Sequence, residues 1–393
     1  MKKSLLALAV LGAFAGAVQA QSSVTIYGIV DEGITYNSKV ATGTGTSTGS
    51  QFQVNTGVIQ GSRLGFKGTE DLGGGLSAIF ALEAGFSADT GALSTSGTGG
   101  TSTLFRRKSI VGLAGGFGSV TVGRQTDYAD TISAFTAVND FGSIVGNIHG
   151  LDRLEGTRTN NSVSYTTANL SGFTGNLMYG FGEQAGSTST GQSFGLAGQY
   201  VNGPLGLGLN YYQSKAGSSV STTSDTGLLS GSGLSYAGYT AGQTAEKVLN
   251  AVASYQFGPA RVYGNYSLVK LPQNVASVTG LSSSTLVTSS TGLTLANAKK
   301  TSTFEIGTAY SLTAALKLLA AIDYSKATFD NVGNTGKLTQ FSLGTDYSLS
   351  QRTDLYAFLS DVRAKNMNNP GTWSTSGSDA NQASVSVGVR HKF

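Results

Sequence analysis

The chain has 393 residues, enough for one large barrel or about two to three ordinary domains. Charged residues make up only 12% of it, which is roughly half the usual share, and there is no cysteine, so disulfides and cysteine-ligated metal sites are excluded. No apolar stretch after residue 20 is long enough for a membrane-spanning helix.

Residues 1–20 have the pattern of a secretory signal peptide. Lys2 and Lys3 precede an apolar stretch, and Val18-Gln19-Ala20 fits the small-x-Ala cleavage pattern. Removing this segment lowers Lys+Arg from 25 to 23 against 21 Asp+Glu, which leaves the mature chain at about +2. A charge so close to neutral argues against a nucleic-acid partner. We therefore predict a signal peptide at 1–20 and one secreted domain at 21–393.

The mature chain is predicted to consist of β-strands with alternating apolar and polar side chains. In Ser62–Thr69, Leu64 and Phe66 share one face, whereas Arg63 and Lys67 share the other. The run Val24–Asp31 and several later runs alternate in the same way. This period indicates strands with one apolar face and one polar face.

Short glycine- or proline-bearing turns alternate with long Ser/Thr/Gly-rich connections along the chain. Seven short turns and eight long connections join about sixteen strands. Short turns on one side and long loops on the other are typical of barrels that cross the outer membrane. The predicted fold class is therefore all-β: a 16-stranded antiparallel transmembrane β-barrel, wide enough for an aqueous channel.

The third long connection, residues 125–157, is the least regular part of the chain. It mixes carboxylates with apolar side chains over more than thirty residues, and a loop of this length is usually functional or disordered. Its apolar content argues against disorder. We predict that it folds into the lumen and narrows the pore.

The chain ends in an alternating strand, Ser384–Phe393, with valines on one face. Such a strand would be an aggregation hazard at an exposed sheet edge. In a closed barrel it pairs with the first strand instead.

Taken together, these segments resemble the general porins of Gram-negative outer membranes, of the betaproteobacterial type. The matching pieces are Val24–Gly28, Ser62–Gly75, Val111–Gln125, the strand that begins at Arg158, and the terminal Phe393. The resemblance implies a homotrimer in the cell outer membrane whose third loop folds inward. It also implies contacts with outer-membrane lipid and lipopolysaccharide, and a terminal Phe393 that is read by the barrel-assembly machinery.

The candidate pore-lining charges follow from the alternation and from the resemblance. The cations proposed for one wall are Arg63, Lys67, Arg107 and Arg158, and the acids proposed for the loop opposite them are Asp127, Asp130 and Asp140. Asp140 is chosen because Asn139–Ser143 stands where enteric relatives carry Pro-Glu-Phe-Gly-Gly. Arginine suits such a wall because it stays charged and its planar fork can stack in rows. The alternative for each residue is a solvated surface charge.

No catalytic or cofactor site is expected. The chain has only two histidines, His149 in the long loop and His391 near the terminus, and neither lies where a hydrolase would need it. The predicted function is passive diffusion of ions and small hydrophilic solutes through a weakly anion-selective general porin. The alternatives are a substrate-preferring porin for small anions or sugars, and a secreted β-rich adhesin.

Overall fold

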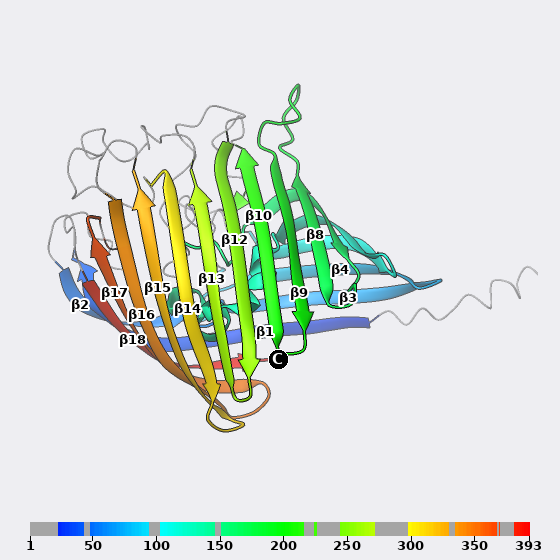
Figure 1. Ribbon diagram of the computed structural model, residues 1–393. Helices are drawn as coiled ribbons and strands as arrows, with labels where there is room; N and C mark the ends of the chain where they lie inside the picture. Colours follow the sequence, from blue (N-terminus) through cyan, green and yellow to red (C-terminus); the bar gives the residue numbers. More distant parts are fainter. Residues whose placement is uncertain are drawn as a thin grey trace, which may run out of the picture.

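The computed structural model describes residues 23–42, 48–93, 103–145, 151–215, 224–225, 244–271, 298–329, 335–367, 369 and 381–393. The predicted signal peptide and parts of the long connections lie outside these residues. Nearly all described residues belong to one antiparallel sheet (Figure 1). Its strands are β1 (Ser23–Ala41), β2 (Thr48–Thr56), β3 (Arg63–Gly73), β4 (Leu76–Gly85), β5 (Lys108–Gly115), β6 (Gly118–Thr126), β7 (Arg158–Thr167), β8 (Phe173–Gly180), β9 (Ser193–Asn202), β10 (Leu205–Lys215), β11 (Ser224–Asp225), β12 (Thr244–Phe257), β13 (Ala260–Lys270), β14 (Lys300–Ser311), β15 (Leu316–Thr328), β16 (Thr335–Ser348), β17 (Thr353–Lys365) and β18 (Asn381–Lys392).

The sheet closes on itself as a barrel of sixteen wall strands. β1 pairs with β18 over residues 29–37, so the first and last strands meet. β2 and β3 pair with successive parts of β1 and together form a single wall strand. The two-residue β11 pairs only with the start of β7 and adds no further wall strand. The predicted 16-stranded antiparallel barrel is confirmed.

The barrel wall has an apolar outer face and a polar inner face. On β14, Phe304 and Ile306 are 54% and 60% exposed, whereas the intervening Glu305 is buried. Inward positions on other strands carry buried polar side chains such as Asp323 and Gln340. This pattern is the reverse of a soluble barrel with an apolar core, and it matches a wall with lipid outside and a polar lumen inside.

The second wall strand is interrupted between β2 and β3, a break that the alternation did not predict. Asp31 of β1 accepts hydrogen bonds from the backbone N–H groups of Ile59 and Gln60, at 2.8 and 2.7 Å, and from the Tyr356 hydroxyl at 2.7 Å. Gly57 turns the chain at φ +72°. The buried carboxylate thus satisfies backbone donors that the interrupted ladder leaves free.

The barrel seam depends on the last residue. The backbone N–H and C=O of Phe393 pair with Gly28 at 3.1 and 3.0 Å. A Cβ atom at Gly28 would lie 2.3 Å from the Phe393 ring, so the ring needs the space that glycine leaves.

We therefore expect Gly28→Val to destabilise the seam by about 1–3 kcal/mol, the usual cost of overpacking. The measurement is the urea midpoint of the refolded barrel in detergent. Gly116→Val is the matched control, because no heavy atom lies within 4 Å of a Cβ placed there. Equal midpoints for the two variants would contradict this account of the seam.

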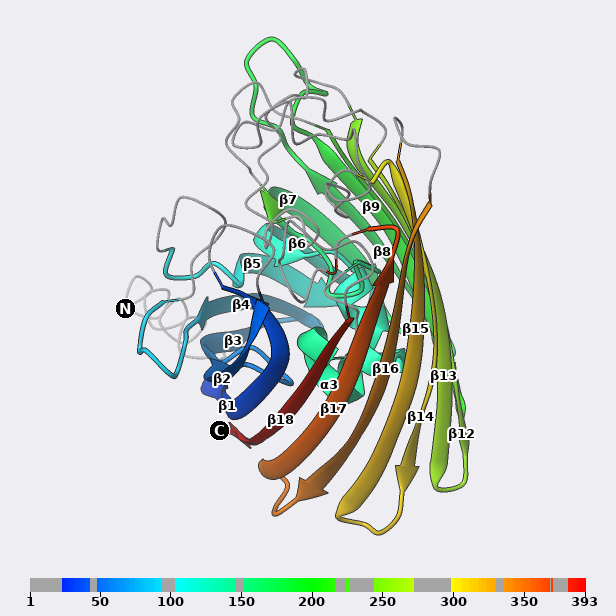
Figure 2. The ribbon, with the colours of Figure 1, turned by 90° about the vertical axis from the view of Figure 1, so that its left-hand side faces the viewer.

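The third long connection contains short helices that the sequence pattern did not predict. They are α2 (Ala129–Ile132), the 3₁₀ helix η1 (Ser133–Phe135) and α3 (Ala137–Val145). These helices contact β10, β12, β14, β15 and β17, and Figure 2 shows α3 between the β1–β4 side and the β14–β18 side of the ring. Within the described residues, no helix is long and apolar enough to cross a membrane.

Candidate functional site

Two of the predicted wall arginines converge on a carboxylate that the sequence analysis did not single out. Arg107 Nε lies 2.6 Å from Glu83 Oε1, and Arg63 Nη1 lies 3.9 Å from the same oxygen. The Tyr27 hydroxyl donates to Glu83 Oε2 at 3.0 Å. One inward-facing acid of β4 therefore holds both guanidinium groups on the same side of the lumen.

Gly65, which has no side chain, leaves room for this arrangement. Gly65 on β3 is directly opposite both Tyr27 and Glu83 in the strand register. A Cβ atom at Gly65 would lie 2.3 Å from the Tyr27 ring, so the ring crosses the strand where glycine leaves room. Lys67 is exposed on the same face, with its ammonium 5.3 Å from the centroid of the Tyr27 ring.

Further cations continue the wall toward β7. Arg124 donates to the side chain of Asn160 at 2.5 Å and to the carbonyl oxygen of Arg106. Arg158 begins β7, and its charge acts on the half-buried Glu155. Burial raises the pKa of Glu155, and Arg158 opposes this shift only in part. Arginine side chains of β3, β6 and β7 and of the residues before β5 thus gather along one part of the ring.

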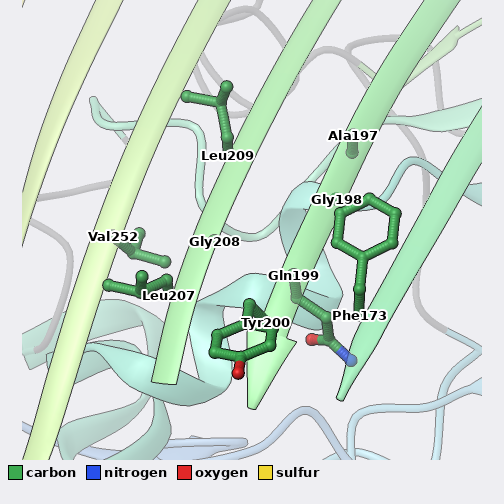
Figure 3. Close-up of a pocket in the computed structure, with 9 residues that line it drawn as sticks. All are labelled: Phe173, Ala197, Gly198, Gln199, Tyr200, Leu207, Gly208, Leu209 and Val252. Atoms are coloured by element: carbon green, nitrogen blue, oxygen red, sulfur yellow. The ribbon is translucent and has the colours of Figure 1, made fainter. Parts of the chain in front are cut away.

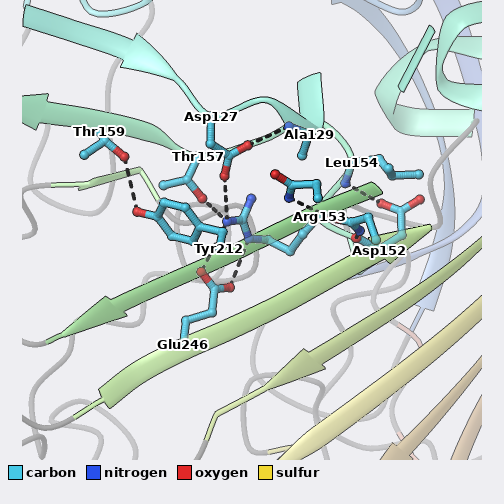
Figure 4. A network of polar contacts seen from close by, with 11 residues as sticks. Asp127, Ala129, Asp152, Arg153, Leu154, Thr157, Thr159, Tyr212 and Glu246 are labelled. Carbon is cyan, nitrogen blue, oxygen red and sulfur yellow. Dashed lines mark hydrogen bonds and ion pairs between the residues drawn. The ribbon is translucent and has the colours of Figure 1, made fainter. Parts of the chain in front are cut away.

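Arg153 is the centre of a buried ionic network that fastens the third connection to the wall (Figure 4). Its Nε lies 3.0 Å from Glu246 Oε1 on β12, and its Nη2 lies 3.8 Å from Asp127 Oδ2. Arg153 also donates to the Thr157 hydroxyl. Burial by itself would lower the pKa of Arg153, but Glu246 and Asp127 outweigh it and raise that pKa. Asp127 therefore ties the segment to the wall and does not face the open lumen.

The pH dependence of this network follows from Asp127. Burial raises its pKa to about 6, and Arg153 opposes that shift only in part. Because an exposed aspartate titrates near 4, Asp127 stabilises the docked segment most below about pH 4, and this contribution is lost as the pH rises through about 6. We expect opening of residues 128–132, measured by amide exchange corrected for its intrinsic rate, to become more frequent over that range. Asp127→Asn should abolish the change, and an unaltered pH profile in this variant would contradict the assignment.

Asp140, the predicted eyelet carboxylate, is paired with an arginine of the opposite wall. Its Oδ2 lies 2.5 Å from Nη2 of Arg261 on β13, and Nη1 of Arg261 donates to the Ala134 carbonyl at 2.8 Å. The N–H of Ala137 donates to Glu305 Oε1 at 3.0 Å. Asp140 is therefore part of a second attachment of the helices to β13 and β14.

Glycines of the wall and of α3 allow the helices to approach the wall closely. A Cβ atom at Gly206 or Gly208 of β10 would lie 2.7 Å from Phe135 or Ile132, respectively. Gly142, at φ +76°, would place a Cβ 2.3 Å from the Ile59 carbonyl oxygen. The apolar side of the segment thus packs on bare backbone.

The predicted site residues therefore fall into two groups. Arg63, Lys67 and Arg107 form one cluster, and Asp130 on α2 is exposed and acts electrostatically on Arg63. Asp127 and Asp140 serve as attachment points. The structure also adds Tyr27, Glu83, Glu246, Arg261 and Glu305, which the sequence analysis did not nominate. The available signal was strand parity, because all five lie at inward positions of their strands, but parity does not distinguish them from the other inward polar residues.

A separate hollow of about 460 Å³ lies among β8, β9, β10 and β12, away from the arginines (Figure 3). Its lining is mainly apolar, with Phe173, Leu207, Leu209 and Val252, and Tyr200 is the single ionisable side chain in it. The charge pattern of the arginine cluster does not extend to this hollow.

Comparisons with known proteins agree with this architecture. A family model described as Gram-negative porin matches residues 7–367. An outer membrane porin protein of Bordetella pertussis is 37% identical over 239 residues, which span 55% of this chain and 60% of that protein. Outer membrane porin protein 32 of Delftia acidovorans is 36% identical over 287 residues, 70% of this chain and 72% of that one. The solved structure of an anion-selective porin from Comamonas acidovorans matches with a TM-score of 0.68 at 25% identity, covering 95% of this chain and 100% of that one.

Proposed function

Because the chain belongs to the Gram-negative porin family of the outer membrane, we propose that it is a general diffusion porin with a weak preference for anions. Ions and small hydrophilic solutes would pass down their gradients through the water-filled lumen. The family consists of channels and not enzymes, so no catalytic step is assigned to any residue.

This proposal rests on the polarity of the closed barrel, whose outer face is apolar and whose inner face is polar. It also rests on the helices of the third connection, which pack against the wall. Lipid-facing apolar residues and buried inward polar residues alternate on the same strands. Arg153 and Asp140 attach the third connection to Glu246 on β12 and to Arg261 on β13. These two strands lie far around the ring from β3. A fixed segment of this kind would set the pore width, which together with lining charge determines selectivity.

Anion preference is supported by the balance of charges that remain after internal pairing. Arg153 and Arg261 pair with Asp127 and Asp140, which removes two of the three predicted acids from the lumen. Arg63 and Arg107 share a single carboxylate, Glu83. We propose that Arg63, Lys67, Arg107 and Arg158 line the constriction and that Asp130 is the acid that faces them.

The partners proposed for this porin are two further copies of itself, outer-membrane lipid and lipopolysaccharide. We also propose that Phe393 is the signal read by the barrel-assembly machinery. Phe393→Ala should lower the amount of folded barrel in the outer membrane, measured by heat-modifiable migration of membrane fractions. Wild-type levels of folded barrel would contradict the assembly role.

The channel proposal is tested by planar-bilayer recording of the refolded protein. We expect stepwise conductance and a reversal potential of anion-selective sign under a salt gradient. Conductance that saturates with one solute would favour the substrate-preferring alternative. Barrels that are inserted but pass no current would contradict the proposal.

A further inference from the structure

Residues 57–62 leave the barrel wall between β2 and β3 and pack inside the barrel, and we call them the inner segment. Both of its ends are held at the backbone of Asp31 on β1. The N–H of Gly57 donates to the Asp31 carbonyl oxygen at 2.7 Å, and the N–H of Asp31 donates to the Ser62 hydroxyl at 3.0 Å. The chain therefore departs from the wall and returns to it at a single residue of the neighbouring strand.

The carboxylate of Asp31 holds the middle of the inner segment. Its Oδ2 accepts from the N–H groups of Ile59 and Gln60, at 2.8 and 2.7 Å, and its Oδ1 accepts from the Tyr356 hydroxyl at 2.7 Å. Asp31 is fully buried, so these bonds are shielded from water. Loss of this side chain would leave two N–H groups of the inner segment without their acceptor, which costs more than the bonds themselves contribute.

The middle of the inner segment packs against α3. Val58 and Ile59, which are 1% and 4% exposed, belong to the same apolar cluster as Phe141. Gly142 lets the backbones approach, because a Cβ atom there would lie 2.3 Å from the Ile59 carbonyl oxygen and 2.5 Å from that of Val58. The position of α3 therefore depends on the inner segment as well as on the wall strands β14, β15 and β17.

The end of the inner segment next to β3 contacts the two arginines proposed for the constriction. Arg63 Nε donates to the Gly61 carbonyl oxygen at 2.8 Å. A Cβ atom at Gly61 would lie 3.3 Å from Nη1 of Arg107, so this guanidinium lies against the same residue. Glu83 contacts both guanidinium groups from β4. The inner segment and Glu83 together fix where the two positive charges lie.

We infer that the inner segment is a second constriction element beside the helices of the third connection, and that Asp31 is its positioning residue. The segment contacts the arginines at one end and α3 in its middle, so one buried carboxylate fixes both the cationic wall and the helix that narrows the lumen. Width and lining charge together determine what a pore passes. This inference rests on the proposed channel function. Asp31 acts through the segment, because its own side chain is fully buried.

The test compares Asp31→Ala with Asp31→Asn in single-channel recordings under a salt gradient. Asparagine can accept from the two N–H groups through its carbonyl oxygen and donate to the Tyr356 oxygen through its amide, so it removes the charge and keeps the attachment. Alanine removes both. Displacing the arginines weakens their interaction with a passing ion less than deleting them would. We therefore expect Asp31→Ala to lower the chloride-to-potassium permeability ratio roughly two- to fivefold, and Asp31→Asn to change it by less than about 1.5-fold.

Thr35→Ala is the control for the loss of a buried polar contact alone. Thr35 is buried four residues beyond Asp31 on the same strand, and its hydroxyl bonds to that of Ser386 at 2.8 Å. Both alanine variants should lower the urea midpoint of the refolded barrel, but Thr35→Ala should keep the wild-type permeability ratio. A wild-type ratio in Asp31→Ala, or an equal fall in Thr35→Ala, would overturn the inference.

Gly142→Ala tests the same link from the side of α3, so the test does not depend on Asp31→Ala being able to fold. The added Cβ would meet the Ile59 carbonyl oxygen, which forces α3 and the inner segment apart. We expect the permeability ratio to fall at least about twofold, and a wild-type ratio would contradict the inference. An inserted wild type that passes no current would overturn the channel function and this inference with it. A conducting wild type with unchanged variants would overturn this inference alone.

Discussion

Replacing Arg153 by methionine is expected to release the third connection from the barrel wall. The guanidinium of Arg153 is almost fully buried between Glu246 and Asp127, and removing it leaves two buried carboxylates without their cation. Removing one member of a buried ion pair lowers the stability of the fold by about 3–5 kcal/mol. In single-channel recordings we expect larger current noise and frequent partial closures, together with faster amide exchange in residues 128–145.

The double variant Arg153→Met/Glu246→Leu is the matched control for this prediction. Replacing both members of a buried pair by apolar groups is often close to neutral, so the second change should restore the part of the lost order that the unpaired Glu246 carboxylate costs, while Asp127 stays unpaired. Arg352→Met, on an exposed short turn, controls for the loss of one arginine. If Arg153→Met conducts as quietly as Arg352→Met, the network does not hold the segment in place.

Neutralising Arg63 and Arg107 together is expected to turn the channel from anion-preferring toward cation-preferring. The change removes two positive charges and leaves Glu83, which both arginines contact, as an uncompensated negative charge in the wall. In water, a unit charge a few ångströms from the ion path interacts with a passing ion by about 1 kcal/mol, and salt reduces this interaction energy. We therefore expect Arg63→Gln/Arg107→Gln to lower the chloride-to-potassium permeability ratio by roughly five- to twentyfold.

The matched control for the selectivity change is Lys317→Gln/Arg352→Gln, which removes two exposed cations at the short-turn end of the barrel. Reversal potentials of both variants should be compared in the same salt gradient. The assignment of Arg63 and Arg107 to the constriction fails if both variants shift the potential equally.

The barrel itself could be predicted because its pattern is local. Alternation of side chains along each strand depends only on the two-residue period, and the lengths of the turns depend only on neighbouring strands. The faces assigned to Leu64 and Arg63, and the pairing of the last strand with the first, agree with the structure. Local alternation could not predict the break between β2 and β3, because Asp31 stabilises it from another strand.

The candidate site could be predicted only in part, because it joins residues that are distant in the chain. Glu246 is 93 residues from Arg153, and Arg261 is 121 residues from Asp140. The third connection forms no regular strand pairing, so no register predicts where around the ring it packs. The loop acids could therefore be identified by type, whereas the roles of Asp127 and Asp140 as attachment points depend on partners that only the folded barrel brings near.

The reversal potential of the wild-type channel tests the central claim most directly. The refolded protein should be inserted into a planar bilayer and recorded at the single-channel level under a salt gradient. A conducting channel with a modest potential of anion-selective sign is the expected result, because the wall arginines outnumber the acids left facing them. A clearly cation-selective potential would contradict the proposed charge balance at the constriction, and a silent barrel would contradict the channel itself.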